Sequence, residues 1–303
     1  MEKFFGIDIG GTNIKIGVVN TDGEMEQKVK YGSKDRPEDM TFADHFVNCL
    51  RNEVNNYPGI KKVGIGVPGT MSKDRSTLLE LPNLPTLCGV NLLEILQSNF
   101  PEHIFHLEND ANAAALGEYY FAGEKVPENY IFITLGTGVG GGVIIEHDIF
   151  KGGDGNGVEI GHMLSKNGKT LEENIGKMGI MKRAKKLMDK KKYSDSVLHN
   201  IEALDPKKIA KEGLKGDKLA LKIYKEVGKL LGENLVSTIR LLDIKNIIIG
   251  GGLAASYDII IDPCMKALMK NLTDYYVKDI SITKAHLGNN AGIMGAASLC
   301  YLK

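Results

Sequence analysis

The sequence has little cysteine, no surplus charge of either sign and no long apolar run near its first residue. Its 38 Lys and Arg residues balance 38 Asp and Glu residues, so no overall field attracts nucleic acid or an anionic membrane. The four cysteines are scattered singly, which is typical of reduced thiols. Gly6 and Asp8 interrupt the first apolar run, which leaves no room for a signal peptide or membrane span. These absences favour a cytoplasmic protein with small-molecule partners, with no nucleic-acid or membrane partner.

Two glycine-rich turns are the most distinctive features that the chain does have. Residues 4–19 and 130–145 share one pattern, an apolar run, a Gly/Thr-rich turn and a second apolar run. β-Branched residues flank the glycines, as in two strands joined by a tight turn. Aligning Asp8 with Thr134 overlays the two segments, so we expect two halves of related build. A chain of 303 residues is long enough for two domains.

Helix and strand patterns alternate elsewhere in the chain. Apolar residues at helical spacing start at Phe42 and stop near Pro58, and an alanine-rich helix is expected before Gly123. Alternating strands and helices indicate an α/β fold. The patterns predict helices over 42–57, 110–121 and 219–231 and strands over 63–67, 104–107 and 247–249.

The first glycine turn has the composition of a phosphate-binding loop. Gly10 and Gly11 lack Cβ atoms, so a phosphate could approach the backbone N–H groups, and Thr12 adds a hydroxyl. Asp8, at the end of an apolar strand, is well placed to hold Mg²⁺, directly or through water. An ordinary hairpin with a turn-stabilising Asp is the alternative. The candidate phosphate-binding residues here are Asp8, Gly10, Gly11, Thr12, Asn13 and Lys15.

The second turn matches the dinucleotide pattern G-x-G-x-x-G over 136–141, as does the segment 64–69. A dinucleotide turn must open a helix, whereas the residues after Gly141 form a strand pattern. We therefore predict a second phosphate turn, with Thr137 donating to the γ-phosphate. A third glycine cluster at 250–252 would let adenine and ribose approach the backbone. The candidates are Gly136, Thr137, Gly138, Gly251 and Gly252.

Asp110 is the candidate general base. Phosphoryl transfer from ATP to a hydroxyl group needs a carboxylate that accepts the hydroxyl proton. Asp110 lies where a strand gives way to a helix, a rigid position from which a side chain can be aimed. Asp is also a preferred helix N-cap, so this reading stays open. The neighbouring Asn109 could hydrogen-bond a sugar hydroxyl.

Glu159 and His162 form a carboxylate–imidazole pair three residues apart, behind the glycine-rich segment 152–157. Such a pair suits recognition of hydroxyl groups by a binding loop. A zinc site is the alternative, but no cysteine lies nearby and two candidate ligands are too few. A structural role for the histidine also stays open.

Five motifs in order resemble the ROK family of sugar kinases and repressors. They are Asp8-Ile-Gly-Gly-Thr12, Glu108-Asn-Asp-Ala-Asn112, Leu135-Gly-Thr-Gly-Val-Gly-Gly141, Glu159-Ile-Gly-His162 and Ile249-Gly-Gly-Gly252. The resemblance covers nearly the whole chain and implies an actin-like ATPase, or ribonuclease H-like, duplicated fold of two domains around a cleft. We expect one domain over 1–115, completed by a C-terminal helix at 290–303, and a second over 116–289.

The resemblance also implies roles for individual residues. It makes Asp110 the general base. It implies sugar ligands at Gly69, Asn83, Asn109, Glu159, His162 and Glu172. Many members of the family carry a cysteine-rich zinc loop between the residues equivalent to His162 and Glu172. In this sequence the segment 165–170 contains no cysteine. We therefore expect no structural zinc.

The expected activity is transfer of the ATP γ-phosphate to a hexose hydroxyl, at the 6-position, with Mg²⁺. The sugar stays open among glucose, allose, fructose, N-acetylmannosamine and a β-glucoside, although 72–77 resembles D-allose kinases. The alternative is a non-catalytic sugar-binding regulator. Repressors of the family carry an N-terminal DNA-reading element, and only three residues precede the first strand pattern, so we expect none. The resemblance favours a homodimer.

Overall fold

The computed structural model describes residues 1–123 and 126–301 and divides into two compact units. Unit 1 comprises Met1–Glu128, Gly142–Val158 and Asn289–Lys303. Unit 2 comprises Asn129–Gly141 and Glu159–Gly288. The domain boundary expected after residue 115 lies inside a helix of unit 1, and this unit also takes in 142–158.

The first sheet has the strand order β3-β2-β1-β4-β7. β1 is antiparallel to β2 and parallel to β4, and β4 is parallel to β7. The carboxyl ends of β1, β4 and β7 therefore meet at one edge of the sheet. The strands are β1 (Lys3–Ile9), β2 (Asn13–Asn20), β3 (Met25–Gly32), β4 (Lys62–Val67) and β7 (Ile104–Asn109).

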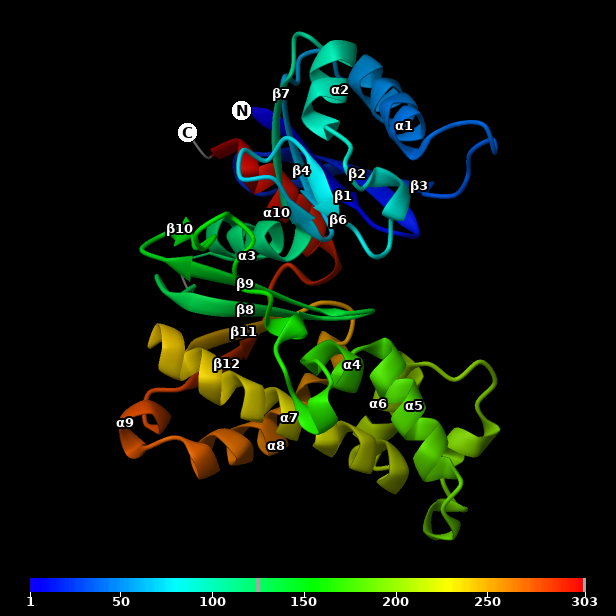
Figure 1. Ribbon diagram of the computed structural model, residues 1–303, viewed down its shortest axis with the longest axis vertical. Helices are drawn as coiled ribbons and strands as arrows, with labels where there is room; N and C mark the ends of the chain where they lie inside the picture. Colours follow the sequence, from blue (N-terminus) through cyan, green and yellow to red (C-terminus); the bar gives the residue numbers. More distant parts are fainter. Residues whose placement is uncertain (124–125, 302–303) are drawn as a thin grey trace. The chain divides into compact units, whose positions relative to one another are not determined.

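Helices cover both faces of this sheet (Figure 1). α1 (Phe42–Asn56) and α2 (Leu92–Asn99) lie on one face, and α10 (Ala291–Ser298) packs on β1 and β4 from the other, beside α3 (Asp110–Phe121). Gly6 and Gly64 allow this close approach, because a Cβ atom at either position would clash with the backbone of α10. A small hairpin of β5 (Thr70–Met71) and β6 (Leu78–Glu80) follows β4.

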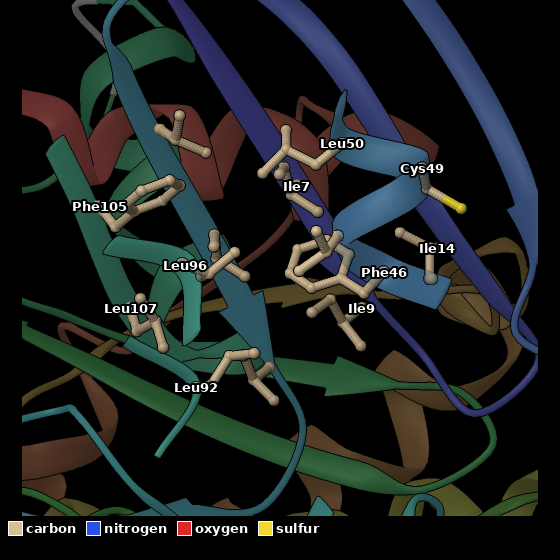
Figure 2. Close-up of a cluster of buried hydrophobic side chains, with 14 of the residues drawn as sticks. Ile7, Ile9, Ile14, Phe46, Cys49, Leu50, Leu92, Leu96, Phe105 and Leu107 are labelled. Atoms are coloured by element: carbon tan, nitrogen blue, oxygen red, sulfur yellow. The ribbon is translucent and has the colours of Figure 1, made fainter. Parts of the chain in front are cut away.

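The core of unit 1 lies between the sheet and the pair α1 and α2 (Figure 2). Apolar residues spaced at the helical period on α1 meet the inward residues of the strands, so burial of one helical stripe fixes the helix on the sheet. The side chains labelled in Figure 2 are Ile7, Ile9, Ile14, Phe46, Cys49, Leu50, Leu92, Leu96, Phe105 and Leu107, each at most 8% exposed.

The second sheet repeats the order of the first, as β10-β9-β8-β11-β12. In both sheets the first strand of a glycine-turn hairpin pairs with a later parallel strand, and a further parallel strand follows. The duplicated build expected from the two turns is confirmed. The strands are β8 (Tyr130–Leu135), β9 (Val139–Ile145), β10 (Asp148–Ile149), β11 (Asn246–Gly250) and β12 (Ser281–Lys284), and the boundary between the units falls within β9.

Helices account for most of unit 2. The predicted long helix is α7 (Lys218–Leu242), which packs along α8 (Tyr257–Asn271) (Figure 1). The others are α4 (Leu171–Ile175), α5 (Lys177–Met188), α6 (Pro206–Leu214) and α9 (Asp274–Val277). Within the described part of the chain, no helix has the length and apolar character needed to cross a membrane.

Candidate active site

The carboxyl edge of the first sheet brings together two predicted functional carboxylates, Asp8 and Asp110. Asp8 of β1 pairs in register with Gly66 of β4, which pairs in turn with Glu108 of β7. Asp110 begins α3 directly after β7. One strand therefore separates β1 from β7, which spaces their backbones by about 10 Å. A Cβ atom added to Gly66 would lie 3.6 Å from the Asp110 Cα, so this glycine leaves the space beside Asp110 free of a side chain from β4.

Asp8 has a cation beside it. The Lys15 Nζ lies 2.5 Å from the Asp8 Oδ2, and the Asp8 side chain is 19% exposed. On the other side, α10 packs so closely that a Cβ atom on Gly292 would lie 2.7 Å from the Asp8 Cγ. A partly exposed carboxylate that is already paired with a cation offers the oxygen ligand that Mg²⁺ prefers. The residues present therefore fit the predicted ion.

The first glycine turn directs its carbonyl groups into the protein. Gly10 N–H donates to the Asn13 carbonyl at 2.9 Å, and Ser33 donates from its Oγ to the Gly10 carbonyl and from its N–H to the Thr12 carbonyl. Among the described residues, no hydrogen-bond acceptor is found for the N–H groups of Gly11 and Thr12. Two available N–H groups beside Lys15 suit an anion such as phosphate.

Asn109 is the N-cap residue of α3. Its Oδ1 accepts from the N–H groups of Ala111 and Asn112 at 2.9 and 3.2 Å, whereas Asp110 is the first helical residue. The reading of Asp110 as the N-cap is therefore wrong. The Asn109 Nδ2 donates to the Gly69 carbonyl at 3.1 Å, so two predicted sugar ligands are hydrogen-bonded to each other. Asn83, a further candidate, is exposed and lies against Gly11.

In unit 2, the second and third glycine clusters meet at the ends of β8 and β11. Gly136 N–H donates to the Gly138 carbonyl at 2.9 Å, and no acceptor is found within the described ranges for the N–H groups of Thr137 and Gly138. Gly251 has φ +84°, and a Cβ atom there would lie 2.6 Å from the Thr134 Oγ1. Only glycine tolerates both this conformation and this contact. The arrangement repeats that of the first turn, with Gly252 adjacent to Gly136.

Lys207 of α6 is a basic residue that the sequence reasoning missed. Its Nζ lies 3.6 Å from the position of a Cβ atom on Gly252. A lysine in a stretch rich in lysine carries no signal of its own, so only the fold shows that this one reaches the third glycine cluster.

The predicted sugar ligand Glu172 lies against the second glycine turn. Its Oε2 accepts from the Val139 N–H at 2.9 Å, and a Cβ atom on Gly138 would lie 3.0 Å from its Cδ. The Thr137 carbonyl accepts from the Lys177 N–H at the start of α5, at 3.1 Å. The segment that carries Glu172 therefore also holds the predicted phosphate turn in place.

Glu159 and His162 flank a short 3₁₀ turn, with the His162 Nδ1 3.8 Å from the Glu159 Oε2. Burial raises the pKa of the Glu159 carboxyl, the charge of Glu172 raises it further, and His162 opposes the shift. The structure thus brings Glu159, His162 and Glu172 close together. Among the described residues, no group of three or more His, Cys, Asp or Glu side chains could hold a metal ion.

The segment that lacks cysteine forms a compact hairpin. The Ser165 N–H donates to the Lys169 carbonyl at 2.7 Å, and the Lys166 Nζ lies 2.5 Å from the Glu226 Oε1 on α7. The Asn174 Nδ2 donates to the carbonyls of Lys166 and Thr170 at 3.1 and 2.9 Å. Hydrogen bonds and ion pairs therefore hold the hairpin between His162 and Glu172.

Two sheets of one strand order, each with a glycine turn after its first long strand, define the actin-like ATPase fold of two α/β units. The sequence model of the ROK family matches residues 4–302. The chain belongs to the ROK family.

Known relatives cover nearly the full chain. The glucokinase of Thermotoga maritima is 30% identical over 98% of this chain and 96% of its own. A solved structure from Cytophaga hutchinsonii is 40% identical, with a TM-score of 0.92 and 99% coverage of both chains. A ROK family glucokinase from Streptomyces griseus, solved with glucose and AMPPNP, is 27% identical, with a TM-score of 0.82 over 99% of this chain and 100% of that one. A xylose repressor of Caldicellulosiruptor bescii is 25% identical over 98% of this chain and 77% of its own.

Proposed function

We propose that the protein is an ATP-dependent sugar kinase that transfers the γ-phosphate of ATP to a hexose hydroxyl, at the 6-position. The observation that carries this proposal is the placement of Asp8 and Asp110 at one edge of a sheet, on either side of β4, whose Gly66 puts no side chain beside Asp110. The two glucokinase relatives support the same reaction class.

In this proposal, Asp110 acts as the general base. Its carboxylate accepts the proton of the sugar hydroxyl while the hydroxyl oxygen attacks the γ-phosphorus in line with the leaving ADP oxygen. Asp110 is held in place because the Asn109 side chain caps α3 and so fixes the backbone of its first turn. A rigidly aimed base lowers the cost of orienting the two reactants.

The glycine turns bind the nucleotide. The available N–H groups of Gly11 and Thr12 in unit 1, and of Thr137 and Gly138 in unit 2, donate to phosphate oxygens. Lys15 adds a positive charge. Gly251 supplies the backbone turn that only glycine allows, Gly252 leaves the backbone open to ribose and adenine, and Lys207 adds a charge at that cluster.

Asp8 would hold the magnesium ion of Mg–ATP, directly or through water. When bound, the ion neutralises negative charge on the β- and γ-phosphates. Lys15, which lies 2.5 Å from the Asp8 carboxylate, is free to turn towards a phosphate once another cation takes its place.

The sugar site is proposed to comprise Gly69, Asn83, Asn109, Glu159, His162 and Glu172. Carboxylates, an amide and an imidazole are the groups that recognise hydroxyls through directed hydrogen bonds. The glucose-bound relative makes glucose the first sugar to test, followed by allose, fructose, N-acetylmannosamine and a β-glucoside. We also propose a homodimer, which sedimentation of the purified protein would test.

The direct test is a coupled ADP-release screen over these sugars at saturating Mg–ATP, with the phosphorylated position of the product determined by NMR. The proposal predicts sugar-dependent ADP release and a 6-phosphate. A product phosphorylated elsewhere would contradict the assigned position, and ADP release that is independent of sugar would contradict the acceptor class.

A non-catalytic sugar-binding regulator is the second candidate, because the xylose repressor aligns with nearly the whole chain. This function predicts sugar binding, measured by calorimetry, with no sugar-dependent ADP release for any sugar that binds. The same purified protein and the same screen therefore separate the two candidates.

A further inference from the structure

A buried ion cluster surrounds Glu108, the residue just before the proposed site segment at 109–110. Glu108 is 1% exposed. The Arg75 Nη2 lies 3.3 Å from its Oε1, and the Lys151 Nζ lies 2.9 Å from its Oε2. These two cations come from separate segments, the turn of the β5–β6 hairpin and the residues after β10.

Arg75 also fastens the glycine-rich loop 152–157. Its guanidinium donates to the Gly155 carbonyl and, at 3.4 Å, to the Asn156 Oδ1. The Asn156 side chain accepts from the Met71 N–H at 3.0 Å and donates to the Met71 carbonyl at 2.8 Å. Two loops that lie far apart in the sequence are therefore joined to each other and to Glu108.

On its other side, Glu108 supports the start of α3. Its Oε1 accepts from the Asn109 N–H at 2.9 Å and from the Asn112 Nδ2 at 3.2 Å. Asn109 in turn caps α3 and donates to the Gly69 carbonyl. Hydrogen bonds, together with the ion pair between Arg75 and Glu108, thus link loop 152–157 to the residue that precedes Asp110.

The chemistry of the cluster favours a positioning role. A buried carboxylate is costly unless its charge is paired. Here each oxygen faces a cation, and Oε1 also accepts hydrogen bonds, whereas among the described residues Oε2 is held by the ion pair with Lys151 and accepts no hydrogen bond. Arginine, unlike lysine, presents a planar fork that can bind Glu108 and the Gly155 carbonyl together.

We infer that Arg75, Glu108 and Lys151 form a positioning cluster that holds loop 152–157 against the start of α3 before any sugar is bound. The inference rests on the proposed function only in naming Asn109 and Asp110 as parts of the acceptor site. Arg75 and Glu108 act through the loop and through Asn109, so they are positioning residues of that site.

Hydrogen exchange on the full-length, sugar-free protein tests the cluster without reference to catalysis. We expect slow exchange of the Gly157 amide, which donates to the Lys151 carbonyl at 2.9 Å, and of the Met71 amide, which donates to the Asn156 Oδ1 at 3.0 Å. Both amides should exchange at least about tenfold faster in Arg75→Gln and in Arg75→Lys. The double variant Arg75→Gln/Glu108→Gln should exchange no faster than Arg75→Gln, because both substitutions break one network. The matched control is Glu102→Gln, which breaks the exposed pair between Glu102 and Lys61 and should leave exchange of both amides unchanged.

Kinetics then link the cluster to the site. We expect Arg75→Lys to raise KM for the sugar by about tenfold while KM for ATP stays within about twofold, with unchanged thermal stability. Equal exchange rates of the two amides in the original protein and in Arg75→Gln would overturn the cluster, whatever the activity. Faster exchange with an unaltered KM for the sugar would overturn its role in the site. If the original protein phosphorylates no sugar, the proposed function fails, while the exchange result still decides the cluster.

Discussion

Gly292, in the first turn of α10, is packed against the Asp8 carboxyl group. Its position shows how a residue without a side chain can serve a site by leaving room. Such residues escape sequence reasoning, because nothing in the pattern Ala291-Gly-Ile-Met-Gly-Ala296 indicates which neighbour the helix meets. Asp8 was a candidate from sequence, since a carboxylate at the end of an apolar strand before two glycines has few structural reasons to be there, and its role in metal binding stays a prediction.

Gly292→Ala should displace the Asp8 carboxylate, because the new Cβ would lie 2.7 Å from its Cγ and Oδ2. We expect kcat to fall at least about tenfold and the Mg²⁺ concentration for half-maximal activity to rise. The measurement is a Mg²⁺ titration of sugar-dependent ADP release. Gly59→Ala is the matched control, because a Cβ atom there meets nothing within 4 Å. An unaltered Mg²⁺ requirement in Gly292→Ala would contradict the role of Asp8.

Glu159 should give the sugar site a pH dependence. Burial and then Glu172 raise the pKa of its carboxyl, against the opposing charge of His162. Below this pKa the group is protonated and neutral, so kcat/KM for the sugar should fall as the pH decreases, starting at a higher pH than an ordinary glutamate would give. A profile from roughly pH 4 to 8 measures this. Glu159→Gln should lack that limb, and identical profiles for the two proteins would refute the assignment.

At the scale of elements, the longer helices and strands followed from periodicity and end signals. α3 spans Asp110–Phe121 as expected, with a cap before it and Gly123, at φ +86°, after it. α1 ends before Pro58. The β5–β6 hairpin could not be predicted, because strands of two and three residues show no period. The pairing of Arg75, on that hairpin, with Glu108 could not be predicted either, because only the tertiary fold brings the two residues together.

The N-cap of α3 offers a test that separates stability from function. Asn109→Ala removes the cap and the bond to the Gly69 carbonyl, so the free energy of unfolding should fall by about 1 kcal/mol. Asn91→Ala removes the corresponding cap of α2 and should cost about the same. Denaturant unfolding measures both. Only Asn109→Ala should lower kcat/KM for the sugar, and equal activity losses in the two variants would argue against a site role.

The hairpin between His162 and Glu172 should need no metal. Ser165, Lys166 and Asn174 supply its hydrogen bonds and its ion pair to α7. We expect metal analysis of the purified protein to find no stoichiometric zinc, and a strong chelator to leave the thermal midpoint unchanged. One equivalent of tightly bound zinc whose removal lowers that midpoint would show that the hairpin account is mistaken.

At the scale of the whole molecule, the duplication could be read from two matching turns, because each turn carries its own strand pair. The way the chain divides between the units could not. Residues 142–158 join unit 1 although the chain on both sides of them belongs to unit 2, and no local pattern records such an exchange. That a C-terminal segment completes the first unit was expected from the family resemblance alone. The identity of the sugar is likewise outside the reach of sequence, since it depends on the positions of hydrogen-bonding groups rather than on their order along the chain.

The central claim is that Asp110 accepts the proton of the sugar hydroxyl, and Asp110→Asn tests it most directly. Asparagine keeps the shape of the side chain but cannot act as a base, so kcat should fall by about 10²- to 10⁴-fold while sugar affinity, measured by calorimetry, stays within a few-fold. Asp44→Asn, in the first turn of α1 and exposed, should retain full turnover. Near-normal kcat in Asp110→Asn would contradict the account.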